Sequence, residues 1–366
     1  MPDNRLTDVA VFGATGYTGK QIVRELLAAG CSVVCVGRDV DKLHKLAADV
    51  GQPVRVEAAD LTERSRIEEI CSDVRTVVNA AGSFVETCEP VARAAIATRT
   101  HYVDISGEQR SIQYVFDGLG AAAAGAGVAL IPSAGFYAAL ADALVSLIAA
   151  DTGRIDTVDI AYHITDWTPS GAAYANFLRG MGQPIVQFDH DYVEVRTPLL
   201  RTTEFPDPVG TRTVFTYPAP DAVTLPRHLD VGTLRTWMSA STFGSPVPDR
   251  FVPLMTRAVG AALRSPLRSL AETLFSATTR STHTRIDDDP TRFWISVRVE
   301  GASGVRAATL SADGIFDLTA PIAASIVGTT LEDAFAVTGA VSPAQIIEPR
   351  AFLDGLAGHG LTYTLS

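Results

Sequence analysis

Short apolar runs alternate with amphipathic stretches along the first third of the chain. The apolar runs are almost uninterrupted, which is typical of strands that a parallel sheet buries on both faces. The stretches between them repeat apolar positions at helical spacing. This alternation predicts a doubly wound parallel sheet, the Rossmann arrangement of an α/β protein. The expected strands are 9–13, 32–37, 54–60, 75–82, 101–107 and 128–135, and the expected helices are 17–30, 39–51, 64–73, 89–100 and 115–127.

The pattern changes after about Asp151. Residues 155–167 alternate between apolar and polar positions, and 205–221 and 291–311 are typical of antiparallel hairpins. This second part is therefore expected to be an inserted α+β domain. The predicted divisions are a Rossmann domain over 1–138, the α+β domain over 139–343, and a C-terminal helix and strand within 344–366 that return to the first domain.

Bulk composition narrows the class of protein. The chain has 366 residues, of which 47% are hydrophobic and 19% are charged, so it should fold around large buried cores. Its net charge of −11 argues against nucleic acid or an anionic membrane as the main partner. Residues 121–150 carry a single charged side chain, Asp142, but glycine and proline break the stretch, so no membrane span is expected.

Cysteine use and the first residues both favour a cytoplasmic protein. The cysteines lack metal-ligand spacing, so we expect reduced thiols and no metal site. The first residues show no basic segment followed by an apolar one, as a signal peptide would require. The acidic run 287–289 before Pro290 is interpreted as a solvated turn rather than a metal site. The cysteines are Cys31, Cys35, Cys71 and Cys88.

Three glycines spaced three apart join the first expected strand to the first expected helix. Gly13 would permit the tight bend, Gly16 would let backbone approach a pyrophosphate, and Gly19 would let the helix pack against the sheet. The helix N-terminus adds N–H groups and partial positive charge for the phosphates. The setting of strand, helix and further βα units favours dinucleotide binding over a purely structural turn. Other members of the turn expected to bind the cofactor are Thr15, Tyr17 and Thr18.

Residues at the ends of later strands indicate which dinucleotide is bound. Arg38 follows the second strand, where an acidic residue would bind the ribose of NAD, and its guanidinium matches the 2′-phosphate of NADP. Lys42 can add positive charge one turn later. The alternative makes Arg38 a surface residue and Asp39 the ribose ligand. Asp60 either binds the adenine amine or caps the next helix. The fourth strand ends in residues that would meet the middle of the cofactor, Asn79, Ala80, Ala81 and Gly82.

Lysine is confined to the N-terminal part of the chain, at Lys20, Lys42 and Lys45. The chain therefore contains no Tyr-x-x-x-Lys pair, which excludes the catalytic arrangement of short-chain dehydrogenases. The same distribution excludes a lysine Schiff base in the second domain.

Five motifs occur in order, VFGATGYTG, VGRDVDKL, VVNAAGSF, HYVDISGE and IPSAGFYAALAD. Together they resemble the saccharopine dehydrogenase-like family, and within it the trans-acting enoyl reductases, over about residues 8–145. The resemblance implies a Rossmann domain, an inserted α+β domain that often mediates dimerisation, NADP(H), and hydride transfer to C=N or C=C. It carries Gly13, Thr15, Gly16, Arg38, Asn79 and Gly82 over to the cofactor, and Asp104, Gly107 and Glu108 over to the loop facing the active cleft.

The chain departs from these relatives at two positions near the expected nicotinamide. Ser83 stands where proline is usual, and Tyr137 replaces an acidic residue. Tyr137 follows the sixth strand, so its hydroxyl could donate a proton to the substrate or its ring could simply pack. Glu108 follows the fifth strand and is a candidate acid or base, or a helix cap. His163, in the second domain, is the third catalytic candidate, with a structural role as its alternative.

The sequence therefore predicts a cytoplasmic NADP(H)-dependent oxidoreductase that transfers hydride to a C=C or C=N bond of a small organic, biosynthetic substrate. Two alternatives stay open: a redox-neutral isomerase or cyclase that holds NADP(H), and a non-catalytic NADP-binding sensor or scaffold. The second domain should form the substrate pocket and a homodimer interface within about 150–340. The residues expected to line the substrate pocket are Asp104, Asp166, Trp167 and Tyr174.

Overall fold

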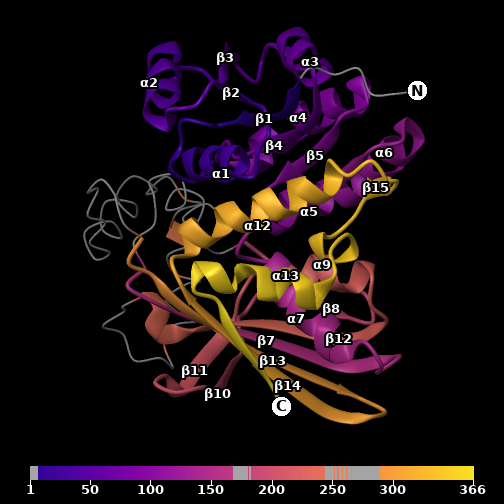
Figure 1. Cartoon of the computed structure of the whole chain (residues 1–366). Coiled ribbons are helices and arrows are strands. Elements are labelled where there is room, and N and C mark those ends of the chain that lie inside the picture. The colour runs from indigo at the N-terminus through magenta and orange to yellow at the C-terminus, as the bar shows by residue number, and fades with distance from the viewer. Residues whose placement is uncertain are drawn as a thin grey trace. The chain divides into compact units, whose positions relative to one another are not determined.

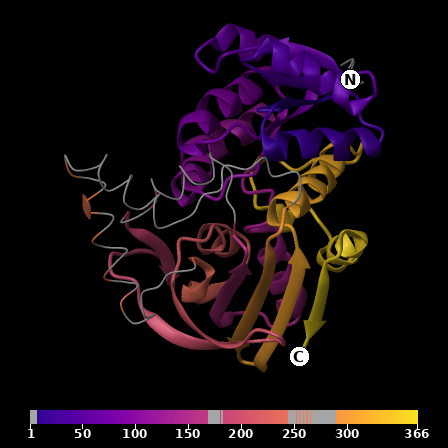
Figure 2. The same cartoon turned by 90° about the vertical axis from the view of Figure 1, so that its left-hand side faces the viewer.

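The chain forms two compact units, each built from two separate stretches of sequence (Figure 1, Figure 2). The first unit contains residues 1–143 and 316–359, and the second contains residues 144–315 and 360–366. Residues 144–315 of the second unit thus lie between the two stretches that form the first unit. The computed structural model describes residues 7–167, 180, 183–243, 251, 254, 258, 261, 262, 265 and 289–366.

A seven-stranded parallel sheet forms the centre of the first unit, in the order β15-β6-β5-β4-β1-β2-β3. Val9 of β1, the strand between β4 and β2, lies opposite Val33 on one side and Thr76 on the other. The strand order reverses between β1 and β4, and open α/β sheets bind their ligands at the carboxyl ends of strands beside such a reversal. The strands are β1 (Thr7–Phe12), β2 (Val33–Gly37), β3 (Arg55–Ala58), β4 (Val74–Asn79), β5 (His101–Asp104), β6 (Ala129–Ile131) and β15 (Gly339–Ala340).

Helices cover both faces of this sheet. Successive side chains of β1 point to opposite faces, and all four from Val9 to Phe12 are buried, so neither face is open to water. The helices of this unit are α1 (Tyr17–Ala28), α2 (Val40–Val50), α3 (Arg64–Ser72), α4 (Phe84–Thr98), α5 (Gln109–Gln113), the π-helix η1 (Tyr114–Leu119), α6 (Gly120–Ala126), α12 (Ile315–Thr330) and α13 (Pro349–Gly355), with 3₁₀ turns η5 (Pro343–Gln345) and η6 (Leu356–His359). The helix α7 (Ala139–Ala149) begins in the first unit and continues into the second.

Two elements of the first unit come from a region that the sequence assigned to the second domain. The helix α12, orange in Figure 1 and Figure 2, lies beside the indigo helix α1. The rings of Phe316 and Tyr17 meet there edge to face, with centroids 6.0 Å apart. The short strand β15 adds to the sheet because Gly339 pairs in parallel with Ala129 of β6. The return to the first unit therefore begins at Phe316 rather than at residue 344.

The last residues of the chain belong to the other unit. The strand β16 (Thr362–Leu365) pairs antiparallel with β14 (Gly304–Asp313), with Leu310 opposite Tyr363. The sequence expectation that all of 344–366 returns to the Rossmann domain is therefore corrected for residues 360–366. The physical reason is that the backbone of β16 pairs with β14 and so extends the second sheet by one strand.

The second unit is built on a nine-stranded, mostly antiparallel sheet. Seven strands follow the order β10-β11-β12-β7-β13-β14-β16, and β8 joins β9 in a hairpin that pairs with β12. The pairing of β7 with β12 is parallel, with Thr157 opposite Thr233. The further strands are β7 (Ile155–Thr165), β8 (Ile185–Asp189), β9 (Tyr192–Val195), β10 (Leu200–Phe205), β11 (Gly210–Thr216), β12 (Val231–Ser239) and β13 (Arg292–Gly301), and the short helical elements are α9 (Asp221–Thr224), η2 (Leu225–Arg227) and η3 (Ala240–Phe243).

Three further observations concern the described part of the chain. No helix there is long and apolar enough to cross a membrane. No group of three or more His, Cys, Asp or Glu side chains there could hold a metal ion. The four cysteines form no disulfide. Burial raises the pKa of Cys35 to about 11 and the pKa of Cys88 to about 12, so these thiols stay protonated at neutral pH.

Candidate cofactor site and adjoining loops

The glycine turn after β1 is packed so closely that two of its glycines cannot carry side chains. Gly13 has φ +81°, and a Cβ there would lie 2.6 Å from the backbone nitrogen of Ala81. A Cβ on Gly19 would lie 2.2 Å from the carbonyl oxygen of Gly13. The first glycine therefore lets the turn pass against the end of β4, and the third lets α1 pack against the turn.

The outer side of the turn, by contrast, is open. Gly16 is exposed, has an ordinary φ of −70°, and stands at the N-cap position of α1 without a side-chain cap. A Cβ on Gly16 would approach only the carbonyl oxygen of Gly13, at 3.2 Å. The first turn of α1 carries no acidic residue. This helix N-terminus fits a phosphate group, because its N–H groups and dipole favour an anion and no side chain caps it.

Side chains beside the glycine turn differ in their surroundings. Thr15 and Thr18 are half-buried next to it. The hydroxyl of Tyr17 donates a hydrogen bond to the carboxylate of Asp317 at 2.8 Å. Tyr17 was expected at the cofactor, but the structure directs this hydroxyl to α12. Asp317 follows Tyr17 by 300 residues, so no local sequence signal could have found the contact.

Two charged residues follow β2: Arg38, which is exposed, and Asp39, whose carboxylate contacts Lys42. Asp39 caps α2, accepting a hydrogen bond from the backbone nitrogen of Lys42 at 3.1 Å. Its carboxylate also pairs with the Lys42 ammonium at 3.1 Å. These contacts, led by the backbone hydrogen bond, lower the pKa of Asp39. The alternative interpretation, in which Asp39 binds the ribose, would compete with the role of Asp39 as the cap of α2. The side chain of Arg38, by contrast, is exposed to solvent.

Asp60 shapes its own turn after β3. Its Oδ1 accepts hydrogen bonds from the Thr62 hydroxyl at 2.7 Å and the Thr62 nitrogen at 2.9 Å. These bonds, with a smaller contribution from the charge of Arg38, lower the pKa of Asp60. The N-cap position of α3 itself is Glu63, whose carboxylate accepts from the Asp60 nitrogen at 2.9 Å. Asp60 thus stabilises the turn that precedes α3, where the sequence predicted a contact with the adenine of the cofactor.

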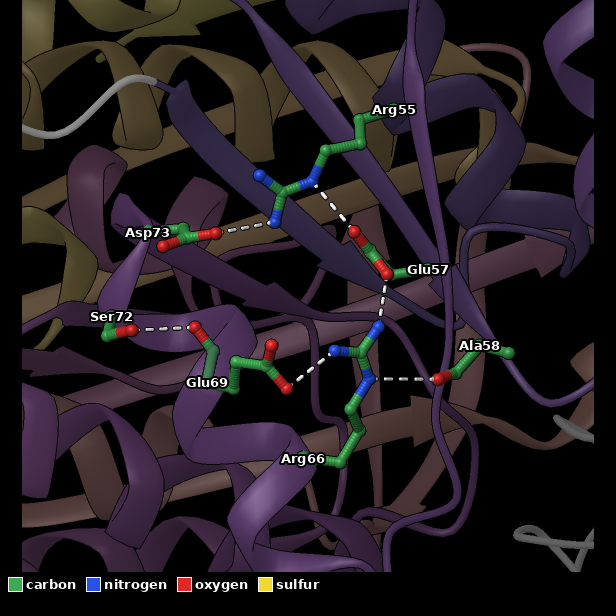
Figure 3. Close-up of polar contacts among 7 residues, drawn as sticks. All are labelled: Arg55, Glu57, Ala58, Arg66, Glu69, Ser72 and Asp73. Atoms are coloured by element: carbon green, nitrogen blue, oxygen red, sulfur yellow. Dashed lines mark hydrogen bonds and ion pairs between the residues drawn. The ribbon is translucent and has the colours of Figure 1, made fainter.

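A network of ion pairs holds the edge strand β3 against α3 (Figure 3). Arg66 of α3 pairs with Glu57 of β3, and its Nε donates to the carbonyl oxygen of Ala58 at 3.4 Å. Arg55 bridges Glu57 at 3.0 Å and Asp73 at 2.9 Å. The figure shows both guanidinium groups converging on the Glu57 carboxylate. The network fixes the strand end from which the Asp60 turn starts.

Asn79 stabilises the loop after β4 through side-chain hydrogen bonds. Its side chain is fully buried, and its Oδ1 accepts from the nitrogen of Ala81 at 3.1 Å. Its Nδ2 donates to the hydroxyls of Thr87 at 3.2 Å and Tyr102 at 3.3 Å. Thr87 in turn donates to the carbonyl oxygen of Ala81 at 2.9 Å. Asn79 therefore fixes the backbone of the Ala80–Gly82 loop, and of this group Gly82 is the exposed member.

Ser83 closes that loop in a conformation that favours glycine. Its φ is +61°, and it stands at the N-cap position of α4. Proline, whose ring fixes φ near −65°, cannot adopt this conformation. The proline that the family resemblance led us to expect at this position would therefore not fit the backbone conformation of Ser83.

Glu108 caps a helix from a distance. Its two carboxylate oxygens accept from the backbone nitrogens of Phe84 at 3.1 Å and Val85 at 3.2 Å. These are the first two residues of α4, which begins five residues earlier than the sequence predicted. The helix-cap alternative thus matches the geometry of Glu108, although the capped helix is not the one that follows it in sequence.

Removing one of the two acceptor oxygens of Glu108 should lower the stability of the first unit. Glu108→Gln replaces one carboxylate oxygen with an amide group that cannot accept from a backbone N–H. We expect a loss of about 1–2 kcal/mol in the free energy of unfolding, as for other helix caps. Urea titration at neutral pH measures this loss. Glu89→Gln, on the exposed face of the same helix, is the matched control and should change stability little. Equal stability of Glu108→Gln and wild type would contradict the capping role.

Asp104 is enclosed rather than exposed to a substrate. It is fully buried, and three donors surround its carboxylate. Oδ1 accepts from the backbone nitrogens of Ser106 and Ser133, both at 2.9 Å, and Oδ2 accepts from the Tyr102 hydroxyl at 2.8 Å. Burial raises the pKa of Asp104 to about 6. The expectation that Asp104 lines the substrate pocket is corrected, because no part of its carboxylate reaches the surface.

Tyr137 lies in a strained loop after β6. Ser133 and Ala138, at its two ends, have φ +63° without being glycine, and such residues concentrate at functional sites. The half-buried ring of Tyr137 packs over Gly107, with Cδ2 3.5 Å from where a Cβ of Gly107 would stand. The hydroxyl of Thr319 in α12 accepts from the nitrogen of Phe136 at 3.3 Å. The loop thus contacts both the segment that follows β5 and the helix α12.

The remaining candidates lie in the second unit. His163 on β7 is 4% exposed and packs between Phe205 and Trp294, with ring centroids 5.6 and 5.5 Å away. Burial lowers the pKa of His163 to about 4, so its ring is neutral at physiological pH. Its Nδ1 has no hydrogen-bond partner among the described residues. The structural alternative therefore suits His163. Asp166 is exposed and Trp167 half-buried just beyond β7, and Tyr174 lies outside the described residues.

Tyr102 has a role that the sequence did not predict. Its ring is fully buried, and its hydroxyl connects Asn79 with Asp104. A signal was present, because Tyr102 stands two positions before Asp104 on one strand, and side chains at that spacing share a face.

The N-terminal part of the chain is similar to a known NADP-binding domain. Residues 9–130 match the model of the saccharopine dehydrogenase NADP binding domain. A saccharopine dehydrogenase-like oxidoreductase of Mus musculus is 30% identical over 157 residues, which cover 38% of this chain and 37% of that protein. The trans-acting enoyl reductase of Mycobacterium leprae is 26% identical over 191 residues, covering 48% of this chain and 46% of the relative. The matched part thus spans less than half the length of these relatives.

The fold comparison extends over the whole chain. Apo saccharopine dehydrogenase (L-Glu forming) from Saccharomyces cerevisiae superposes with a TM-score of 0.63 at 12% identity, covering 98% of this chain and all of the yeast chain. At this identity the likeness shows a shared fold. The family match over 9–130, together with the open glycine turn, establishes a domain that binds a nicotinamide dinucleotide.

Proposed function

We propose, from the premise that residues 9–130 form a saccharopine dehydrogenase-type NADP-binding domain, that this protein is an NADP(H)-dependent reductase. Its substrate would be a small organic molecule with a C=C or C=N bond. The observation that supports this best is the open, uncapped N-terminus of α1 beside the Ala80–Gly82 loop, with the Tyr137 loop following β6 in the same sheet. Cytoplasmic location and a homodimer remain predictions.

The chain's own residues have separable tasks in this proposal. The backbone of the glycine turn binds the pyrophosphate, and Arg38 binds the 2′-phosphate. The Ala80–Gly82 loop brings backbone close to the middle of the cofactor. When bound, NADPH supplies the hydride, and the fold orients its reactive carbon against the acceptor bond. The protein must then deliver a proton to the atom next to the one that receives hydride.

Tyr137 is the side chain best suited to deliver that proton. Its ring is half-buried in a loop at the carboxyl end of the sheet, and a phenol hydroxyl can donate. Glu108 is a weaker candidate because both its oxygens accept from backbone nitrogens of α4. His163 is weaker because it is neutral and enclosed among aromatic rings.

Cofactor preference tests the role of Arg38. We expect Arg38→Ala to weaken NADPH binding by about 1.5–3 kcal/mol, the worth of a charge-assisted hydrogen bond, while NADH affinity changes little. Calorimetric titration of both cofactors measures the two affinities. Arg64→Ala, an exposed arginine paired with Glu68 on α3, is the control. If wild type binds NADH as tightly as NADPH, Arg38 does not select the 2′-phosphate.

Turnover tests the proposed reaction and its proton donor. A panel of small enoyl and imine compounds should include one whose reduction consumes NADPH. On that compound, Tyr137→Phe should lower kcat by about 100-fold, because it removes the hydroxyl and keeps the ring. NADPH affinity should stay unchanged, which separates chemistry from binding. Conversion of a compound without net NADPH consumption would instead favour the redox-neutral isomerase or cyclase.

A further inference from the structure

We propose that Asp104 is a positioning residue that couples the Ala80–Gly82 loop to the Tyr137 loop, so that a displacement of either loop is transmitted to the other. The inference rests on the proposed function for the meaning of the two loops, as cofactor support and proton donor. The coupling itself rests on the geometry of four buried side chains, Asn79, Tyr102, Asp104 and Ser133.

One carboxylate oxygen of Asp104 binds the loop that contains Tyr137. Oδ1 accepts from the backbone nitrogen of Ser133, the first residue of that loop, at 2.9 Å. The backbone carbonyl of Asp104 accepts from the nitrogen of Ala134 at 2.6 Å. The Ser133 hydroxyl donates to the carbonyl oxygen of Ser106 at 2.7 Å. Ser133 has φ +63°, a conformation that a non-glycine residue keeps only when its surroundings determine it. The Asp104 carboxylate is a main part of those surroundings.

The other oxygen of Asp104 reaches the cofactor-side loop in three steps. Oδ2 accepts from the Tyr102 hydroxyl at 2.8 Å. The same hydroxyl oxygen accepts from Nδ2 of Asn79 at 3.3 Å. The Oδ1 of Asn79 accepts from the nitrogen of Ala81 at 3.1 Å. A path of hydrogen bonds therefore connects the Ala80–Gly82 loop, which packs against Gly13, with the backbone of Ser133.

Burial makes this path effective. Asn79, Tyr102, Asp104 and Ser133 are all fully buried, so water cannot replace a hydrogen bond that one of them loses. The Tyr102 hydroxyl has one hydrogen, which it gives to Asp104, and Asn79 fills its acceptor side. If Asp104 lost its acceptor oxygen, the Tyr102 hydroxyl would have to turn, and Asn79 would lose a fixed partner. The two loops should therefore respond together.

Amide hydrogen exchange without any ligand tests the coupling. Asp104→Asn keeps the shape of the side chain and one acceptor oxygen but places an amide group opposite the Tyr102 hydroxyl. We expect the Ala81 amide, which does not touch Asp104, to exchange about 10-fold faster, referenced to the amides of β1. Tyr114→Phe is the control, because its hydroxyl bonds Arg93 on the exposed side of the unit and lies outside the path. An unchanged Ala81 amide in Asp104→Asn would overturn the proposal.

A second variant tests the route. Tyr102→Phe removes only the hydroxyl that joins the two halves, and it should also accelerate exchange at Ala81. In the double variant, exchange at Ala81 should equal that of Tyr102→Phe, because Asp104 acts on Ala81 through Tyr102. Additive acceleration in the double variant would overturn this route. A thermal melt of each variant confirms that the comparison is made on folded protein.

A third measurement separates this inference from the proposed function. NADPH should bind about 10-fold more weakly to Asp104→Asn than to wild type, since the Ala80–Gly82 loop loses its support. If wild type binds no NADPH, the proposed function fails, and the exchange data still decide the coupling. If NADPH binds equally to both proteins while Ala81 exchange is unchanged, the coupling fails and the proposed function stands.

Discussion

A Gly13→Ala variant should lose more than about 4 kcal/mol in the free energy of unfolding, which places it among the most damaging single substitutions. Two costs combine. The first is the positive φ of +81°, which an alanine adopts at about 1–2 kcal/mol. The second is the overlap of the new methyl group with the backbone of Ala80 and Ala81, at 2.6–2.8 Å. The backbone cannot move aside, because Ala80 donates to the carbonyl of Phe12 and Asn79 holds Ala81.

Gly30 provides the matched control for this prediction. It has nearly the same φ, +83°, but a Cβ there would meet nothing within 4 Å. Gly30→Ala should therefore show the conformational cost without the overlap, about 1–2 kcal/mol. Urea unfolding of both variants measures the difference. Equal losses would mean that the backbone of Ala80 and Ala81 moves aside at no cost, which would contradict this prediction.

Gly16→Val should lower NADPH affinity by at least about 100-fold while leaving the melting temperature within a few degrees of wild type. Gly16 has an ordinary φ of −70°, and a Cβ there would meet only the Gly13 carbonyl oxygen, at 3.2 Å. The fold should tolerate the side chain, but its branched methyl groups would occupy the approach to the helix N-terminus. Calorimetry and a thermal melt give the two readouts.

A graded series sharpens the test of Gly16. Gly16→Ala should lose less affinity than Gly16→Val, because a single methyl group blocks less of the approach. Full affinity in Gly16→Val would show that the turn is structural only. A collapse of the melting temperature in Gly16→Val would show that the outer side of the turn is packed, contrary to its exposure.

The sequence predicted the Rossmann unit well because its signals are local. Strands such as β1 are buried on both faces, so their sequences are nearly continuous apolar runs. The glycine turn is also local: Gly13, Gly16 and Gly19 meet within one bend. A chemical role can be assigned there from residue type and spacing, because the geometry follows from seven consecutive residues.

The roles that the sequence left open or missed depend on contacts between distant segments. Glu108 could be interpreted as an acid, a base or a cap, and its contact with Phe84 lies 24 residues away. Asp104 could be exposed or buried, and one of the donors that enclose its carboxylate, the nitrogen of Ser133, lies 29 residues away. The hydroxyl of Tyr17 turns to Asp317, 300 residues later. Residue type limits what a polar side chain can do, but its partners decide which of these roles it takes.

The late return of the chain to the first unit has a consequence for biosynthesis. On the ribosome, the strands β1 to β6 emerge long before β15, because residues 144–315 must be made in between. At typical translation rates the interval between the end of β6 and β15 is roughly 10–40 s. During that time the edge of β6, where Ala129 later pairs with Gly339, has no neighbouring strand from this chain. Unpaired strand edges promote association between chains, so this nascent chain should need protection most while its second unit is being synthesised.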